Sequence, residues 1–276
     1  MNESFWLGSV ILSGVIVYGF ACLRLFVTQH RKVFLPGRKG EESPRDWGLD
    51  YEPLVIDDGE KRLHAWWIPG AHERFVVLFC HGNGVSMHHL AQHVLFLRPL
   101  GGSIVLFDYR GYGDSEGTPD EERMLADGDT VWRYLVSQRG IAGKNILLYG
   151  HSLGGGVATW LAGRYRPVGV VLEGTFTSIP DLGVDHYPWL PVRLLARIQI
   201  DNLARIGAIV DPLFIVHSTE DTLIPFHHAQ RLYDRATCRK HLLAIGGRHN
   251  DAFVQTRDRG VAALKTFFRL EIQPGL

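Results

Sequence analysis

The chain has 276 residues, of which 46% are hydrophobic and 21% are charged. This length and composition are typical of a globular protein with one large domain, and they exclude a disordered or fibrous chain. Basic and acidic residues number 29 each, so no excess of positive charge points to a nucleic-acid partner. The three cysteines show neither disulfide nor zinc-site spacing, which favours a reducing compartment for the folded part.

The N-terminal segment differs from the rest of the chain. Residues 5–23 carry no charge and are mostly aliphatic, aromatic or small. At about 1.5 Å per residue, this run matches the hydrocarbon thickness of a bilayer. We therefore predict a membrane anchor in residues 1–28 that takes no part in the chemistry. A cleaved signal peptide is the alternative, but such peptides have a positive start and a shorter apolar run.

Positive charge follows this apolar run, at Arg24, Arg31, Lys32, Arg38 and Lys39. The positive-inside rule then places the remainder of the chain in the cytoplasm. Residues 29–50 are polar and basic and contain Pro36, Gly37, Gly40 and Pro44, which indicates a linker that leads into the domain. We assign residues 51–276 to one catalytic domain.

From residue 51 onward, short apolar and β-branched runs alternate with amphipathic stretches. The first two runs, 51–56 and 62–68, are separated by Asp57-Asp58-Gly59 and predict a hairpin. Further runs predict buried strands at 75–80, 103–107, 145–149, 168–172, 213–216 and 242–245.

Helices are predicted between these strands, from Met87 to about residue 99, after Ser152, around His227 and from Asn250. Another is expected to open at Thr118-Pro119-Asp120-Glu121, read as a capping box with proline at the first helical position. Strands that alternate with helices indicate a mostly parallel sheet flanked by helices. Catalytic groups in such sheets lie beyond the carboxyl ends of the strands.

A candidate nucleophile follows the strand at 145–149. The sequence Gly150-His151-Ser152-Leu153-Gly154 matches G-x-S-x-G between a strand and a helix. The sharp turn leaves no room for side chains at the flanking positions, hence the glycines, and it lifts the Ser152 hydroxyl above the sheet. The five-residue pattern alone is weak, and the strand and helix around it make it specific.

A serine hydroxyl needs a base, and the base needs an acid to orient it. Among 14 histidines, His249 follows a predicted strand and the Gly246-Gly247 break, which places it at a strand end. Asp221 comes just after the strand at 213–216 and is our candidate acid. Glu220 and Glu173 are the alternatives for that role.

Two backbone N–H groups are expected to form an oxyanion hole. One belongs to Leu153, directly after the nucleophile. The other lies in His81-Gly82-Asn83-Gly84, after the strand at 75–80, where Asn83 is our choice and Gly84 the alternative. No metal or cofactor is expected. His89 and His93 have helical i, i+4 spacing, but without the glutamate of a zinc peptidase we expect a solvated face.

These motifs, together with the runs Phe107–Ser115 and His217–Pro225, resemble the α/β-hydrolase superfamily over residues of about 45–270. The closest resemblance is to its membrane-anchored branch with a small or absent cap, which includes depalmitoylase-like and lysophospholipase-like serine hydrolases. Arg248 departs from the pattern, since a smaller or apolar residue usually precedes the base. The segment 108–115 is expected to be structural.

The resemblance implies a serine carboxylesterase that acts on a small-molecule or lipid acyl ester through an acyl-enzyme. An acyl-protein thioesterase and a lysophospholipase are the alternatives within the same chemistry, and a serine peptidase or a non-catalytic binding protein are more distant ones. Only about forty residues (174–212) separate the strands where caps are inserted, so a large cap is excluded and a short helical flap is expected.

Overall fold

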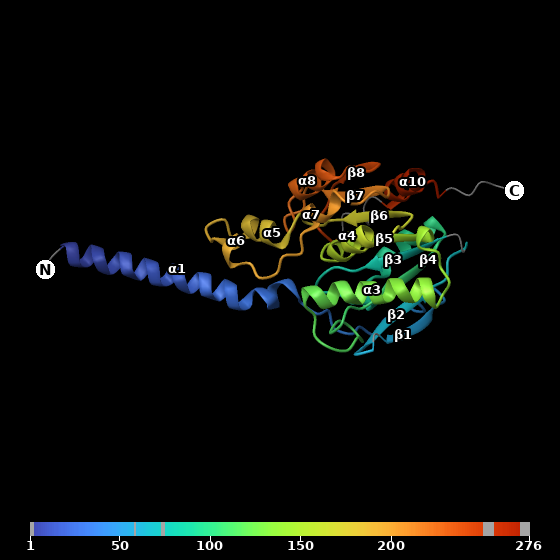
Figure 1. Ribbon diagram of the computed structural model, residues 1–276, viewed down its shortest axis with the longest axis horizontal. Helices are drawn as coiled ribbons and strands as arrows, with labels where there is room; N and C mark the ends of the chain where they lie inside the picture. The colour runs from blue at the N-terminus through green and yellow to red at the C-terminus, as the bar shows by residue number, and fades with distance from the viewer. Residues whose placement is uncertain (1–2, 58, 73–74, 251–256, 271–276) are drawn as a thin grey trace.

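The computed structural model describes residues 3–57, 59–72, 75–250 and 257–270. At its centre lies one eight-stranded sheet with the order β1-β2-β4-β3-β5-β6-β7-β8 (Figure 1). The first pairings, β1 with β2 and β2 with β4, are antiparallel, and all the others are parallel. The strands are β1 (Glu52–Asp57), β2 (Arg62–Ile68), β3 (Val76–Cys80), β4 (Ser103–Phe107), β5 (Ile146–His151), β6 (Gly169–Glu173), β7 (Leu213–Ser218) and β8 (Lys240–Ile245).

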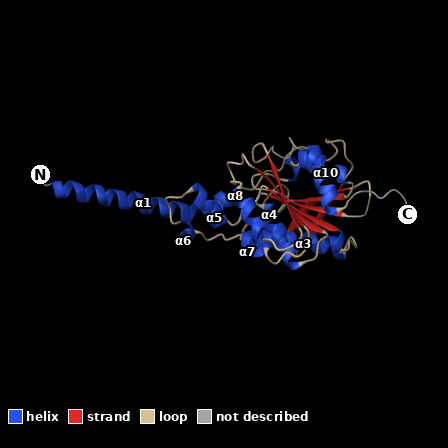
Figure 2. Cartoon of the chain, turned by 90° about the horizontal axis from the view of Figure 1, so that it is seen from above, coloured by secondary structure: helices blue, strands red, loops and turns tan. Residues whose placement is uncertain are grey.

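Helices cover both faces of this sheet (Figure 2). On one face lie α2 (Ala91–Leu97) and α10 (Arg257–Phe268). On the other lie α3 (Glu121–Ser137), α4 (Gly154–Arg164), α7 (Asn202–Ile206) and α8 (His227–Arg235). Short 3₁₀ turns occur at η1 (Met87–His89), η2 (Arg98–Leu100) and η3 (Gly143–Asn145).

The apolar strands form because both faces of the sheet are buried. Every residue of β3 through β7 is buried. Successive side chains point to opposite faces, so Leu78 packs in the core under α3 and α4 while Val77 and Phe79 pack in the core under α2 and α10. A continuous apolar run is the sequence pattern that this arrangement requires.

The predicted mostly parallel sheet is confirmed, with all eight strands at the expected places. The start of α3 was predicted wrongly. Asp120 is the N-cap, since its side chain accepts from Arg123 N at 2.8 Å, so the helix begins at Glu121 and Pro119 lies outside it. The stretch from Met87 divides into η1, α2 and η2. The last helix was expected to begin at Asn250, which lies in a turn; residues 251–256 lie outside the described residues, and the helix is described from Arg257.

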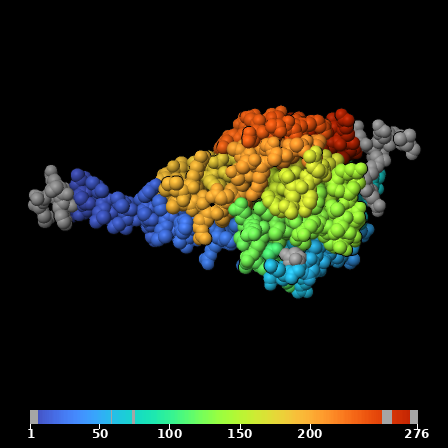
Figure 3. Space-filling view, in the orientation of Figure 1, coloured from blue at the N-terminus to red at the C-terminus, as the bar shows by residue number. Residues whose placement is uncertain are grey.

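One helix, α1 (Glu3–Val33), projects away from the domain (Figure 3). Its stretch Trp6–Val33 is long and apolar enough to cross a membrane. The helix continues well past the predicted end of the span at residue 23. The chain then packs onto the domain, where Phe34 is buried in the core and the Leu35 carbonyl accepts from Gly84 N at 2.9 Å.

The small cap expected between β6 and β7 is present. It consists of α5 (Ile179–His186), α6 (Val192–Leu195) and the connections that lead to α7. The cap lies beside α1, at the end of the domain from which that helix projects (Figures 1 and 3). It therefore covers the edge of the sheet where the candidate site residues lie.

Candidate active site

Ser152 stands in a tight turn between β5 and α4. Its φ is 52°, in the left-handed region that side-chain-bearing residues rarely adopt. A Cβ at Gly150 would lie 2.7 Å from Gly155 Cα, and one at Gly154 would lie 2.0 Å from the Cys80 carbonyl oxygen. The two flanking glycines are therefore required by the close approach of neighbouring backbone, as the sequence predicted.

Three predicted site residues meet at the carboxyl ends of β5, β7 and β8. His249 Nε2 lies 3.1 Å from Ser152 Oγ, and His249 Nδ1 lies 2.6 Å from Asp221 Oδ2. With Nδ1–H donating to Asp221, Nε2 is left to accept the serine proton. The residues are 97 and 28 positions apart in sequence, so the fold brings them together.

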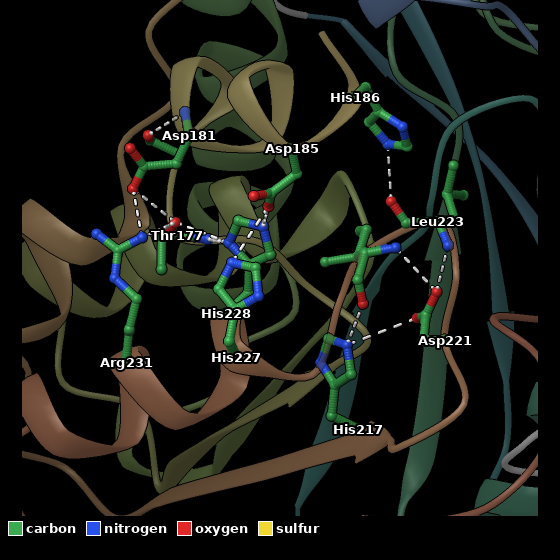
Figure 4. A network of polar contacts seen from close by, with 12 residues as sticks. Thr177, Asp181, Asp185, His186, His217, Asp221, Leu223, His227, His228 and Arg231 are labelled. Atoms are coloured by element: carbon green, nitrogen blue, oxygen red, sulfur yellow. Dashed lines mark hydrogen bonds and ion pairs between the residues drawn. The ribbon is translucent and has the colours of Figure 1, made fainter. Parts of the chain in front are cut away.

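Asp221 is held from several sides (Figure 4). Its Oδ1 accepts from the backbone N–H groups of Leu223 and Ile224, each at 2.9 Å. Beside it, His217 Nε2 donates to the Ile224 carbonyl at 2.7 Å. Burial alone would raise the pKa of Asp221, but the hydrogen bonds from His249 and Ile224 outweigh burial and lower it. The carboxylate is therefore charged and oriented at neutral pH.

The two alternative acids lie elsewhere. Glu220 accepts from Gly247 N at 3.3 Å. Glu173 is buried, and its carboxylate accepts from the Tyr149 hydroxyl at 2.8 Å. Among the described contacts of His249, the carboxylate on Nδ1 belongs to Asp221.

A buried polar cluster beneath Ser152 was not anticipated. It consists of His93, His151 and Glu173, with His93 Nε2 at 3.5 Å from Glu173. Burial lowers the pKa of His151 to about 3, so this histidine is neutral. Burial alone would raise the pKa of Glu173, but the neighbouring histidines and the Tyr149 hydroxyl outweigh burial and lower it to about 2. His93 thus faces the interior instead of the solvated face expected for it, because α2 packs against β3 and β5.

Two groups of three residues have donor atoms close enough to share a metal ion within the described part of the chain. They are His93, His151 and Glu173, and Asp185, His227 and His228, with the donor atoms of each group within 4.8 Å of one another. In the second group His228 donates to Asp185 at 2.7 Å and accepts from Thr177 N at 3.1 Å, so it ties α5 to α8 (Figure 4). The second group is therefore explained by hydrogen bonds that hold α5 against α8.

Both predicted oxyanion donors border the same space. Asn83 and Leu153 line a cavity with Ser152, and neither backbone N–H has a protein acceptor among the described residues. The alternative, Gly84, already donates its N–H to the Leu35 carbonyl at 2.9 Å. The Asn83 side chain accepts from Leu35 N at 2.8 Å and from the Tyr112 hydroxyl at 2.9 Å. The segment 108–115 thus steadies the loop that carries the donor.

The cavity over Ser152 has a volume of about 490 Å³, within the range of small-molecule sites. Its described lining contains no carboxylate and is mainly apolar. The apolar wall comes mainly from the cap and from the base of α1, through Leu25, Val33, Leu35, Phe176, Ile179, Leu182, Val192, Leu195, Leu223 and Ile224. Arg248 is exposed and does not line this cavity.

The last turns of the N-terminal helix border the site, although the anchor was predicted only to take no part in the chemistry. Leu25, Gln29 and Val33 of α1 all line the cavity. The helix reaches the site because Gln29 Nε2 donates to the Leu195 carbonyl at 3.1 Å, which docks α1 onto the cap. Distance along the sequence did not predict distance in space.

Comparison with known proteins agrees with this arrangement. Residues 71–202 match the family described as "Serine aminopeptidase, S33". The chain is 31% identical to an uncharacterized protein of Mycobacterium tuberculosis (88% of this chain, 86% of the relative). It is 30% identical to an uncharacterized membrane protein of Saccharomyces cerevisiae (84% and 86%). It is also 30% identical to the alpha/beta hydrolase domain-containing protein 17B of Xenopus laevis (72% and 68%).

A solved structure shares the fold. The esterase Pf2001 of Pyrococcus furiosus superposes with a TM-score of 0.73 at 21% identity, over 86% of this chain and 98% of that one. At this level of identity the similarity concerns the arrangement of strands and helices.

Proposed function

The chain belongs to the α/β-hydrolase superfamily, and on that premise we propose that it is a serine carboxylesterase. The nucleophile is Ser152, the base is His249 and the orienting acid is Asp221. The observation that supports this most strongly is the unbroken hydrogen-bonded line from Asp221 through His249 to Ser152 beneath an apolar cavity.

The reaction proceeds in two halves. Ser152 Oγ attacks the carbonyl carbon of the ester while His249 Nε2 takes the hydroxyl proton. The oxyanion that forms accepts from the backbone N–H groups of Asn83 and Leu153. His249 then returns the proton to the departing alcohol, which leaves an acyl group on Ser152. A water molecule, deprotonated by His249, releases the acid and restores the serine.

The cavity lining supports an acyl substrate over a peptide. An aminopeptidase has to hold a positively charged α-amino group, and carboxylates are the side chains that do so. The described lining has none and instead includes Arg31 and Lys32, which would repel such a group. An acyl thioester and a lysophospholipid offer the same acyl group and remain the alternative substrates.

The N-terminal helix supports a membrane location. We propose that α1 is one uncleaved span, with the N-terminus outside and the catalytic domain at the cytoplasmic face. The helix runs without interruption through the region where a signal peptide would be cut, and the basic residues lie on the side of the domain. Membrane fractionation after a salt wash, and mass spectrometry of the mature N-terminus, test this proposal.

A substrate series tests the activity. The purified full-length chain is assayed on p-nitrophenyl esters of increasing acyl length, beside an acyl thioester and a lysophospholipid. We expect turnover of esters and covalent labelling by a fluorophosphonate. A chain that neither turns over any acyl substrate nor takes the label would be a binding protein on a hydrolase fold.

A further inference from the structure

We propose that the cavity over Ser152 receives its acyl chain directly from the cytoplasmic leaflet, and that the tip of the cap, Trp189 with Leu194, is inserted in that leaflet beside α1. This inference rests on the proposed esterase function and specifies its substrate as an acyl ester resident in the membrane.

The first observation is that the cap runs along the side of α1. The Tyr18 hydroxyl donates to the Trp189 carbonyl at 3.2 Å, far out on the helix. Nearer the domain, Gln29 accepts from Arg197 N at 2.7 Å and Lys32 Nζ donates to the Tyr187 hydroxyl at 3.1 Å. Contacts at both levels show that the cap and the helix lie side by side, as Figure 3 also shows.

The second observation is the depth of Tyr18. The uncharged run of α1 ends at Leu23, and the first charge is Arg24. Tyr18 precedes Leu23 by five residues, which corresponds to about 7 Å along the axis at about 1.5 Å per residue. If α1 spans the bilayer, the Trp189 backbone that Tyr18 contacts must lie below the membrane surface. Tryptophan and tyrosine are the residues enriched at that level.

The third observation is the exposed apolar surface of the cap. Trp189 is 58% exposed and Leu194 is 86% exposed. Large apolar side chains this exposed are favoured where lipid replaces water around them. The neighbouring outer surface of α1, including Val15 and Val17, is exposed and apolar as well. Because the cap lies beside α1, a bilayer that surrounds the helix would also meet these exposed side chains of the cap.

The cavity over Ser152 is bordered by both α1 and the cap. Leu25 of α1 and Leu195 of the cap line the same cavity as Ser152. We infer that an acyl chain enters between these apolar walls, where α1 and the cap meet. Arg31 and Lys32 line the cavity on the domain side of the span, where they would face the anionic headgroups of the cytoplasmic leaflet.

The base of the cap is fixed on the domain, and its tip contacts α1 through the Trp189 carbonyl. Asp185 of α5 pairs with His227 at 3.2 Å and with His228 at 2.7 Å on α8. Asp181 pairs with Arg231 of α8 at 2.8 Å (Figure 4). These contacts hold α5 on the domain and so set the position of the tip relative to α1.

Activity on two substrates tests the proposal. Leu194→Glu and Trp189→Glu are compared with the wild type and with Val55→Glu, a control on β1 at an equally exposed apolar site (56%). Each is assayed in proteoliposomes on a long-chain ester embedded in phosphatidylcholine–phosphatidylserine vesicles and on a water-soluble p-nitrophenyl ester. We expect the cap variants to lose about tenfold or more on the embedded ester only, because a carboxylate resists entry into the leaflet. The control should lose nothing.

A depth measurement tests the insertion without relying on activity. A nitroxide label is placed at Leu194→Cys, or at Val55→Cys as the control, in a chain that carries Cys22→Ser and Cys238→Ser. In proteoliposomes the label at 194 should be relaxed by oxygen more than by a water-soluble nickel complex, and the label at 55 should show the reverse.

The outcomes separate the two proposals. A wild type with no ester turnover but a lipid-exposed label at 194 would refute the esterase assignment and leave the insertion standing. A water-exposed label at 194, or cap variants with full activity on the embedded ester, would overturn the insertion. A change in oligomeric state caused by Leu194→Glu, without loss on the embedded ester, would assign the tip to a protein interface instead.

Discussion

The site at the strand ends and the cap beside α1 differ in the environment of their side chains. At the strand ends, Asp221 and Ser152 are buried and their polar atoms have partners within the protein. In the cap, Leu194 and Trp189 are largely exposed and apolar. At the strand ends the polar groups are hydrogen-bonded within the protein, whereas the cap exposes apolar side chains to solvent, which is unfavourable in water.

This difference suggests that one region carries out the proposed reaction and the other controls how substrate reaches it. The proposed catalytic groups lie at the ends of sheet strands, so we expect their geometry not to depend on the membrane. The cap and the base of α1 together form most of the cavity wall, so we expect the access of substrate to depend on them. Changes at the strand ends should therefore reduce turnover of every ester, and changes in the second region should matter only for some substrates.

The largest effect is expected for Ser152→Ala. Loss of the nucleophile should lower turnover by about 10⁴ to 10⁶ on all esters and abolish fluorophosphonate labelling. Ser137→Ala, at the exposed end of α3, is the control and should keep both. Labelling that survives in Ser152→Ala would reveal another nucleophile.

Asp221→Asn should be nearly as damaging, with a loss of about 10⁴ in kcat. The amide cannot stabilise the imidazolium, and it favours the wrong tautomer of His249. Glu220→Gln is the matched control, since its carboxylate accepts from Gly247 N and does not contact His249. Equal losses of activity in the two variants would show that Asp221 is not the acid that orients His249.

Asn83→Ala should lower kcat by about tenfold to a hundredfold on every ester. The backbone donor remains, but the loop loses the acceptor for Leu35 N and the Tyr112 hydroxyl and shifts out of position. Asn83→Asp keeps an acceptor there and should recover much of the rate. If Asn83→Ala has no effect, the position of the Asn83 backbone N–H does not depend on the side-chain hydrogen bonds.

Acid should unfold the domain through its buried histidines. Burial lowers the pKa of His228 from 6.5 to about 4 and that of His81 also to about 4. Between those values the unfolded chain binds protons that the folded chain does not, so stability falls as the pH falls below 6.5. Burial raises the pKa of Asp108 to about 7, which partly offsets this loss because the folded carboxyl is protonated over the same interval.

His228→Gln isolates one such group. The variant should weaken the pH dependence of the unfolding free energy between pH 6.5 and 4 by up to about 1.4 kcal/mol per pH unit, which is one proton. Denaturant unfolding at several pH values measures this slope. A loss of stability that is the same at every pH would mean that His228 contributes only packing and hydrogen bonds.

The smallest effect on soluble substrates is expected from removal of the outer part of α1. None of the described side chains in residues 6–23 lines the cavity, so deletion of residues 1–23 should change turnover of a water-soluble ester by less than about threefold and release the protein from membranes. Deletion of residues 1–33 also removes Leu25, Gln29 and Val33 from the wall and should raise KM for the same ester. Equal behaviour of the two deletions would show that the wall does not bind substrate.

The sequence by itself determined the sheet and the place of the candidate site. Continuous apolar runs mark buried strands, and glycines mark the turn at Ser152, because both patterns follow from local sterics and from burial on two faces. The rule that parallel strands present their carboxyl ends on one edge was then enough to group Ser152, Asp221 and His249. Their meeting needed no knowledge of the cap.

Only the tertiary structure decided how the remaining parts meet. Whether Asn83 or Gly84 has a free N–H depended on Leu35, and the burial of His93 beside Glu173 depended on how α2 packs on the sheet. The docking of α1 on the cap joins Tyr18 to Trp189, 171 positions apart. Such contacts arise where two finished surfaces fit together, and neither segment carries a periodic or steric pattern that specifies its partner.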